Sequence, residues 1–121
     1  MKKVILASVL AASAIASTNV NAASGTATIC AGASAAGAGA QVTTATDTFV
    51  KVAFTPKCSA NVFMTDNDQN TYYGVGSGSA KGKTAWVGST AGGSISKNAD
   101  CAATGCTAAN ATTAAGAAPA S

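Results

Sequence analysis

Residues 60–88 read ANVFMTDNDQNTYYGVGSGSAKGKTAWVG, and this stretch decides the fold class that the sequence predicts. Apolar runs lie at residues 60–65, 71–75 and 83–88. A polar turn at 66–70 and a Gly/Ser-rich loop at 76–82 separate them. Short apolar runs bounded by such residues are typical of β-strands. We therefore expect three consecutive strands here.

A further strand is expected just before this stretch. Residues 47–55 (DTFVKVAFT) alternate, with Val50, Val52 and Phe54 on one face and Phe49, Lys51 and Ala53 on the other, and Pro56 ends the run. A short edge strand around Ile95 follows the last turn. Together these predict an all-β fold with a small antiparallel sheet, either a sandwich or an incomplete barrel.

The first 22 residues have the pattern of a secretory signal peptide. A basic Met1-Lys2-Lys3 start precedes an uncharged apolar stretch, and Val20-Asn21-Ala22 supplies small residues for cleavage. The sequence therefore predicts an exported protein of the periplasm or cell surface, and the short signal is typical of bacteria. No later segment is apolar enough to cross a membrane, so no span is expected after the signal is removed.

The composition of residues 23–121 predicts a thin core. Of these 99 residues, 62 are Ala, Gly, Thr or Ser, and only 15 are large apolar residues. Fourteen of the 15 lie in residues 41–101, which we expect to form the β core. The Ala/Gly-rich arm 23–40 and the Ala/Thr-rich tail 102–121 offer little to bury, so both are predicted to be disordered.

Four cysteines in a short exported chain favour two disulfides over a zinc site, because the C-x-x-C spacing of zinc knuckles is absent. They are Cys30, Cys58, Cys101 and Cys106. Four cysteines allow three pairings. The preferred pairing is nested, Cys58–Cys101 with Cys30–Cys106; the alternative is Cys30–Cys58 with a local Cys101–Cys106 loop.

The residue types that are missing exclude several functions. The chain has no His, Arg or Glu, so it lacks imidazole bases and guanidinium anion clamps, and we expect neither an enzyme nor a bound cofactor. Residues 23–121 carry five Lys and four Asp, a net charge of +1, too weak for a nucleic-acid binder.

Asp66, Asp68 and Asn70 resemble the start of a calcium loop, because oxygen ligands at alternate positions can face one ion. Thr71 replaces the glycine of such loops and Ser77 replaces the bidentate glutamate, so only a weak site is expected. An acid/base role for the two aspartates is not expected, since a thin core would desolvate neither.

Tyr72, Tyr73 and Trp86 are the aromatic residues with a polar group. They are candidates for a surface that stacks on a glycan or a peptide, or alternatively for the bulk of the core. Exposed lysines would add weak electrostatic attraction to such a surface.

Thr48–Val62 (TFVKVAFTPKCSANV) resembles the opening strands of fimbrial and spore-coat-U-type subunits, in which an alternating strand leads into a Cys and a further strand. The resemblance covers about 15 residues, and the sequence departs from that pattern afterwards. It implies edge-strand donation between subunits.

The function expected from the sequence is a non-enzymatic structural or interaction role, as a subunit or accessory of a surface assembly. The partner would be a second copy of the chain or another surface protein. The alternative is a weak module that binds Ca²⁺ or a glycan through the Asp66–Asn70 turn and the adjacent tyrosines.

Overall fold

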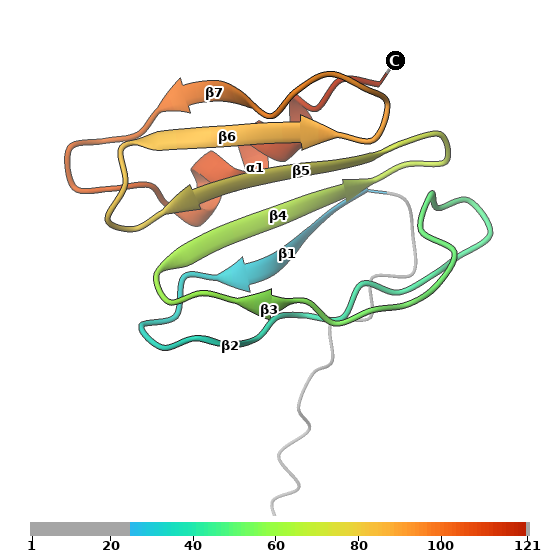
Figure 1. Ribbon diagram of the computed structural model, residues 1–121, viewed down its shortest axis with the longest axis horizontal. Coiled ribbons are helices and arrows are strands. Elements are labelled where there is room, and N and C mark those ends of the chain that lie inside the picture. Colours follow the sequence, from blue (N-terminus) through green and yellow to red (C-terminus); the bar gives the residue numbers. More distant parts are fainter. Residues whose placement is uncertain (1–24, 121) are drawn as a thin grey trace, which may run out of the picture.

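A five-stranded antiparallel sheet forms the body of the computed structural model, which describes residues 25–120 (Figure 1). Its spatial order is β1-β4-β5-β6-β7. The strands are β1 (Gly25–Ala31), β4 (Val62–Asp68), β5 (Tyr73–Ser79), β6 (Thr84–Ser89) and β7 (Ser96–Asp100). A two-stranded pair, β2 (Gly37–Ala38) with β3 (Lys57–Cys58), lies beside β1. The predicted small antiparallel sheet is confirmed.

One helix, α1 (Ala108–Gly116), covers one face of the sheet and lies behind it in Figure 1. Three glycines of β5 lie on the sheet face that carries α1 and its flanking residues, and a Cβ on Gly76 would overlap the backbone of Ala111 and Ala115. The helix turns small side chains toward the strand in return, with Ala111 and Ala114 fully buried. Glycine on one side and alanine on the other therefore let the helix approach the sheet closely.

The prediction that residues 102–121 form a disordered tail is wrong. After a short turn, the tail forms α1, whose start is capped by Asn110 Oδ1 accepting the Thr107 N–H at 2.9 Å. Alanine loses little side-chain entropy on ordering and has the highest helix propensity. The apolar surface that the tail lacks on its own is supplied by the sheet that it covers.

The prediction of a disordered arm at residues 23–40 is wrong for the part that the structure describes. Residues 25–31 form β1, which pairs along β4, and residues 37–38 form β2. Thr26, Thr28 and Ile29 are β-branched and suit a strand, which a count of large apolar residues overlooked. The predicted signal peptide at 1–22 lies outside the described residues.

The disulfides are Cys30–Cys58 and Cys101–Cys106, with Cα–Cα distances of 5.7 and 4.9 Å. The preferred nested pairing is therefore wrong, and the alternative is right. Cys30 lies on β1 and Cys101 directly follows β7, which are opposite edges of the sheet. Strands lie about 4.8 Å apart, so a cysteine beside one edge cannot reach a partner at the other within disulfide distance.

The strand predicted at residues 47–55 is also wrong, because the segment forms only an isolated bridge between Val42 and Phe54. Thr48 is buried and its Oγ1 both donates to Ala45 O and accepts from Ala45 N, each at 2.9 Å. Such local bonding competes with strand pairing. Residues 39–56 instead cross the sheet face opposite α1, where Val42 is buried in a cluster with Ile29 and Cys30.

The remaining strands begin and end differently from the prediction. Asp66 and Asp68, placed in a turn by the sequence, lie within β4, and the turn follows them, with Gln69 N donating to Tyr72 O at 3.0 Å. β5 continues to Ser79 through the predicted loop. Its glycines leave room for α1 and the residues beside it to pack on this strand. The strand predicted at 83–88 is confirmed as β6.

Candidate functional site

A cavity of about 300 Å³ lies beside the β1 edge of the sheet. Its walls are residues 25–29 of β1 and residues 40–43 of the segment that crosses the sheet, and Asp66 and Asp68 of β4 complete it. β1 pairs with β4, and Asp68 lies opposite Gly25 and Asp66 opposite Ala27. The pairing of these strands therefore places both carboxylates against the same cavity.

Strand periodicity explains why the two aspartates come together. Side chains two residues apart on a strand point to the same face, so Asp66 and Asp68 share one face while Asn67 points to the other. Asn67 Nδ2 donates to Ala115 O of the helix at 3.3 Å. Asn70, the third predicted metal ligand, is exposed in the β4–β5 turn and does not line the cavity.

Asp66 is only 3% exposed and both of its carboxyl oxygens accept hydrogen bonds. Oδ1 accepts the Ala27 N–H at 2.9 Å, and Oδ2 accepts the Tyr73 hydroxyl at 3.1 Å. Desolvation raises the pKa of Asp66, the nearby charge of Asp68 raises it further, and the two hydrogen bonds oppose this. The expectation that neither aspartate would be desolvated is therefore wrong.

Tyr73 remains a donor to Asp66. Burial, and then the neighbouring carboxylate of Asp66, raise the pKa of the Tyr73 phenol. The phenol therefore keeps its proton at neutral pH and holds the Asp66 side chain against the cavity wall.

Asp68 is 5% exposed and only one of its oxygens has a partner. Oδ1 accepts the Phe49 N–H at 2.7 Å. Oδ2 is buried and has no hydrogen-bond partner among residues 25–120. Buried carboxylate oxygens in native proteins nearly always have partners, so this oxygen is the most unusual polar atom of the site.

The cavity offers oxygen ligands only. Within the described part of the chain, no group of three or more His, Cys, Asp or Glu side chains could hold a metal ion. Two carboxylates with neighbouring hydroxyl and amide side chains suit a hard cation that keeps some of its water, rather than a transition metal.

The predicted surface of three aromatic residues does not form. Tyr72 packs on the α1 side of the sheet against the cluster of Ala85, Val87, Ala114 and Ala118, whereas Tyr73 packs on the opposite side with Ile29 and Met64. Adjacent residues that enter a strand point to opposite faces, which separates the two tyrosines. Trp86 is 45% exposed and is not part of the buried core.

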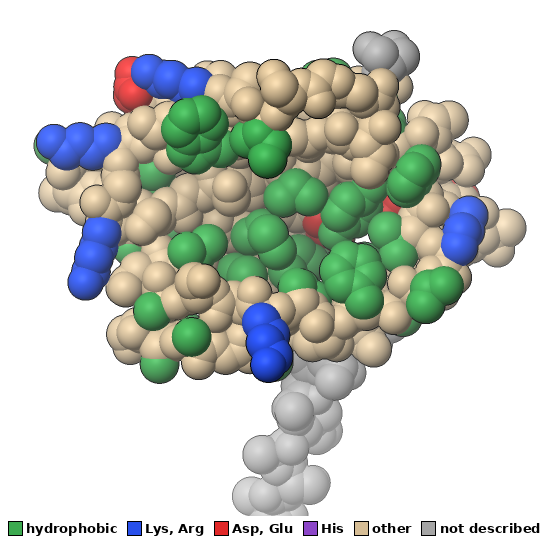
Figure 2. Space-filling view, viewed as in Figure 1, with side chains coloured by type: hydrophobic (Ala, Val, Ile, Leu, Met, Phe, Trp, Pro, Cys, Tyr) green, Lys and Arg blue, Asp and Glu red, His purple; other side chains and the backbone are tan. Residues whose placement is uncertain are grey.

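A second feature is the open face, defined as the sheet face opposite α1 over β5, β6 and β7. It carries Trp86 and Ile95, which are 45% and 75% exposed. A groove of about 420 Å³ runs beside Trp86, lined also by Val62, Ser77 and Lys83. In Figure 2, hydrophobic side chains gather in the middle of this side of the molecule and lysines lie around its border.

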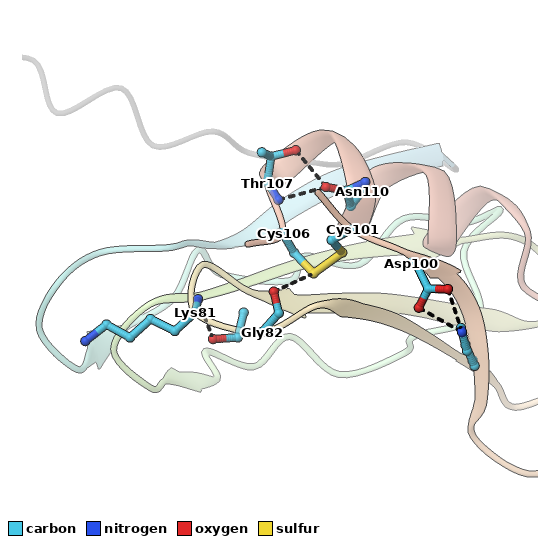
Figure 3. Close-up of a disulfide and its surroundings, with 9 residues drawn as sticks. Lys81, Gly82, Asp100, Cys101, Cys106, Thr107 and Asn110 are labelled. Atoms are coloured by element: carbon cyan, nitrogen blue, oxygen red, sulfur yellow. Dashed lines mark hydrogen bonds and ion pairs between the residues drawn. A yellow bond between two sulfur atoms is a disulfide. The ribbon is translucent and has the colours of Figure 1, made fainter. Parts of the chain in front are cut away.

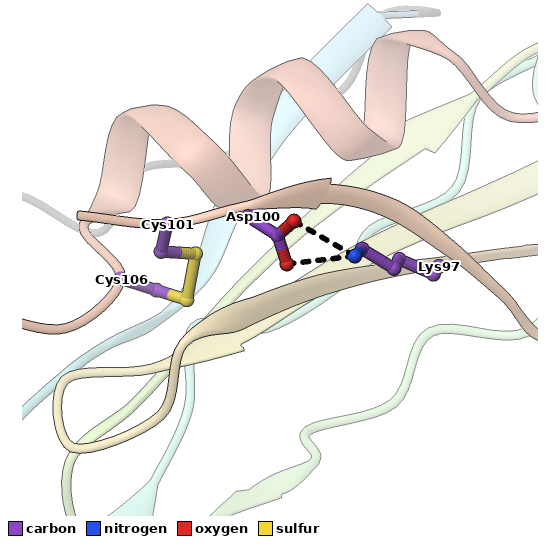
Figure 4. Close-up of polar contacts among 4 residues, drawn as sticks. All are labelled: Lys97, Asp100, Cys101 and Cys106. Atoms are coloured by element: carbon purple, nitrogen blue, oxygen red, sulfur yellow. Dashed lines mark hydrogen bonds and ion pairs between the residues drawn. A yellow bond between two sulfur atoms is a disulfide. The ribbon is translucent and has the colours of Figure 1, made fainter. Parts of the chain in front are cut away.

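The outer edge of β7 is poorly suited to accept another strand. Its pairing with β6 shifts register between Ala85 and Trp86, which leaves an extra residue, Asn98, on β7. Lys97 Nζ forms an ion pair with Asp100 Oδ1 at 2.7 Å along this edge (Figure 4). Bulges and charged side chains are the usual protection of an exposed edge.

The Cys101–Cys106 disulfide closes the turn that leads from β7 into α1 (Figure 3). Cys106 Sγ lies 3.7 Å from Gly82 O in the β5–β6 turn. The bridge therefore packs the start of α1 against the end of the sheet that carries Lys81 and Lys83.

No model of a known protein family matches this chain, and neither curated proteins nor solved structures give a match. The resemblance to fimbrial and spore-coat-U-type subunits is not supported by the structure either, since Thr48–Val62 contains no continuous strand before β3. Among the described residues, no helix has the length and apolar character needed to traverse a bilayer.

Proposed function

We propose that this chain is a small exported protein of the periplasm or cell surface with a non-enzymatic structural or interaction role, and that it associates through the open face. Two disulfides and no free cysteine among the described residues fit an oxidising compartment. The absence of His, Arg and Glu from the sequence supports a role without catalysis.

The observation that carries this proposal is the uncovered apolar centre of the open face. α1 covers one side of the sheet, and on the other side Val42 and Val50 of residues 39–56 pack in a cluster with residues of β1 and β4 and with Tyr73 at the start of β5. Over β5–β7, Trp86 remains exposed. Ile95 lies close to Gly88, since a Cβ added to Gly88 would be 3.3 Å from Cγ1 of Ile95. An aromatic anchor beside a groove, with charged residues around it, is the usual anatomy of a protein interface.

Burial of acids makes the surface more basic than the net charge of +1 indicates. All five lysines of residues 23–121 are exposed, whereas Asp66 and Asp68 are buried. Only Asp47 and Asp100 remain as exposed acids, so the exposed side chains carry five positive and two negative charges, an excess of +3. Two copies of the chain therefore repel each other at low salt, and this repulsion is screened at high salt.

The partner that we propose is a second copy of the chain. Sheets commonly pack face to face about 10 Å apart, and a two-fold arrangement would cover both open faces at once. The protected β7 edge favours this face over the edge-strand donation that the sequence resemblance implied.

Sedimentation of the oxidised chain 23–121 over a range of concentrations tests the proposal. We expect concentration-dependent association that strengthens as salt is raised. Trp86→Ser and Ile95→Ser should each weaken it about tenfold or more. Val52→Ser, which removes an apolar side chain that is 78% exposed outside the open face, is the matched control. A monomer at high concentration and high salt, or an equal effect of the control, would contradict the proposal.

A further inference from the structure

The unpartnered oxygen of Asp68 needs a positively charged or hydrogen-donating partner. Only 5% of Asp68 is exposed, and this residue lines the cavity beside β1. A buried anionic oxygen without a partner is strongly unfavourable. The other three carboxyl oxygens of Asp66 and Asp68 each accept a hydrogen bond, from Phe49 N–H, Ala27 N–H and the Tyr73 hydroxyl.

Oδ1 of Asp68 already accepts the Phe49 N–H, and no residue among 25–120 donates a hydrogen bond to Oδ2. A cation in the cavity meets the requirement without creating a new unsatisfied group.

The chemistry of the cavity selects the kind of cation. Asp66 lies on the same strand face, and each of its oxygens accepts one hydrogen bond, which leaves a lone pair for an ion. Gln41, Thr26 and Thr28, whose side chains carry neutral oxygens, also line the cavity. Calcium accepts such mixed carboxylate, carbonyl and water ligands in flexible geometry, whereas magnesium requires a near-ideal octahedron.

We propose that the cavity between β1 and residues 40–43 binds one Ca²⁺ ion, with Asp68 as the anchoring carboxylate and Asp66 as the second. The ion keeps several waters, because the cavity is larger than a bare ion. Asn70 takes no part, so the site lies on a strand face and not in a calcium loop. The site is separate from the open face and stands independently of the proposed association. With two carboxylates, the affinity falls in the millimolar range of extracellular sites.

Calcium titration of the oxidised, chelator-treated chain 23–121 tests this proposal, with thermal unfolding and calorimetry as readouts. For a Kd of about 1 mM, 10 mM CaCl₂ raises the folded-to-unfolded ratio about elevenfold. This corresponds to an increase in Tm of roughly 5–10 °C for a domain of this size. KCl at matched ionic strength should not reproduce the increase.

Three variants locate the site. Asp68→Asn keeps the acceptor for Phe49 N–H but removes the charge, and it should abolish the calcium-induced shift. Asp66→Asn should reduce it. Asp47→Asn, the same change at an exposed aspartate, should leave it unchanged. No shift in the wild type, or an equal shift in Asp68→Asn, overturns the proposal.

Terbium luminescence provides a readout on the wild-type fold if Asp68→Asn does not fold. Tb³⁺ replaces Ca²⁺ at oxygen sites and is excited through a nearby tyrosine. Tyr73→Phe should dim the calcium-displaceable signal, whereas Tyr72→Phe, which alters a ring packed on the α1 side of the sheet, should not. A signal that calcium does not displace, or one equally affected by both variants, would also overturn the site.

Discussion

At the scale of single residues, the buried carboxyl of Asp66 links stability to pH. Its pKa is raised above the ordinary value of 3.8, mainly by desolvation. The folded chain therefore holds a proton on Asp66 over a pH range in which the unfolded chain has lost it. Where the folded state binds more protons, the free energy of unfolding decreases as pH rises.

We expect this contribution to be fully present below the unfolded pKa and to be lost as pH rises through the folded pKa of Asp66. Asp66→Asn removes it, so the variant should lose less stability than the wild type between about pH 3 and pH 7. Urea unfolding at several pH values in chelator-treated buffer measures the slope. Asp47→Asn serves as the control, and identical slopes for wild type and Asp66→Asn would show that Asp66 is not desolvated.

At the scale of elements, the contact between α1 and β5 depends on the absence of side chains. Gly74, Gly76 and Gly78 alternate along the buried face of β5, and a Cβ on any of them would come closer than 3.0 Å to α1 or its flanking residues. The helix is alanine-rich on the matching face. Its stability therefore comes from docking and not from a broad apolar stripe of its own.

Gly76→Ala should force α1 away from the sheet, since the new Cβ meets backbone atoms that cannot rotate aside. Overpacking of this kind costs about 1–3 kcal/mol of the free energy of unfolding. Gly37→Ala is the matched control, because a Cβ there meets nothing within 4 Å. Denaturant unfolding compares the two, and equal stability would mean that the helix does not pack as closely as described.

At the scale of the whole molecule, covalent bonds compensate for a thin core. Only 15 large apolar residues are available in residues 23–121, and several of these are exposed. Domains of this kind commonly depend on disulfides. The two bridges close loops of very different length, with sequence separations of 28 and 5 residues.

Loss of Cys30–Cys58 should therefore destabilise the fold more than loss of Cys101–Cys106. The chain-entropy relation gives about 3.5 kcal/mol for the long loop and about 2 kcal/mol for the short one. Paired Cys→Ser variants at each bridge, compared by urea unfolding, measure the difference. The opposite order would show that the short bridge acts mainly by holding α1 in place, and not by restricting the unfolded chain.

Several features of this molecule could be predicted because their causes are local. β6 could be predicted because residues 83–88 form a short apolar run around Trp86 between two turns. The two disulfides were predicted from cysteine number and compartment. Asp66 and Asp68 occupy alternate positions, which indicates a shared face, and they do line one cavity; the sequence nevertheless placed them in a turn with Asn70, whereas the structure places them in β4 and Asn70 outside the cavity.

The remaining features depend on which distant segments meet. The Ala-rich tail carries no stripe of large apolar residues that would indicate a buried helix. None is needed, because the alanines of the helix pack against the row of glycines on β5. The alternation in residues 47–55 predicted a strand. Instead, Thr48 Oγ1 bonds to the nearby main-chain oxygens of Ala45 and Val50, and the segment forms only the isolated bridge between Val42 and Phe54. The nested disulfide pairing failed because the order of strands across the sheet cannot be deduced from the spacing of cysteines.

The sequence by itself determined the class of fold, the presence of covalent bridges, the lack of imidazole and guanidinium side chains, and the two carboxylates of one strand face. Periodicity, residue type and residue count act within a few residues along the chain, so they can be evaluated without coordinates. Only the tertiary structure decided the disulfide pairing, the helix over β5, the burial of Asp68 and the exposure of Trp86. Each of these is a property of contacts between segments far apart in sequence, where packing and desolvation are determined.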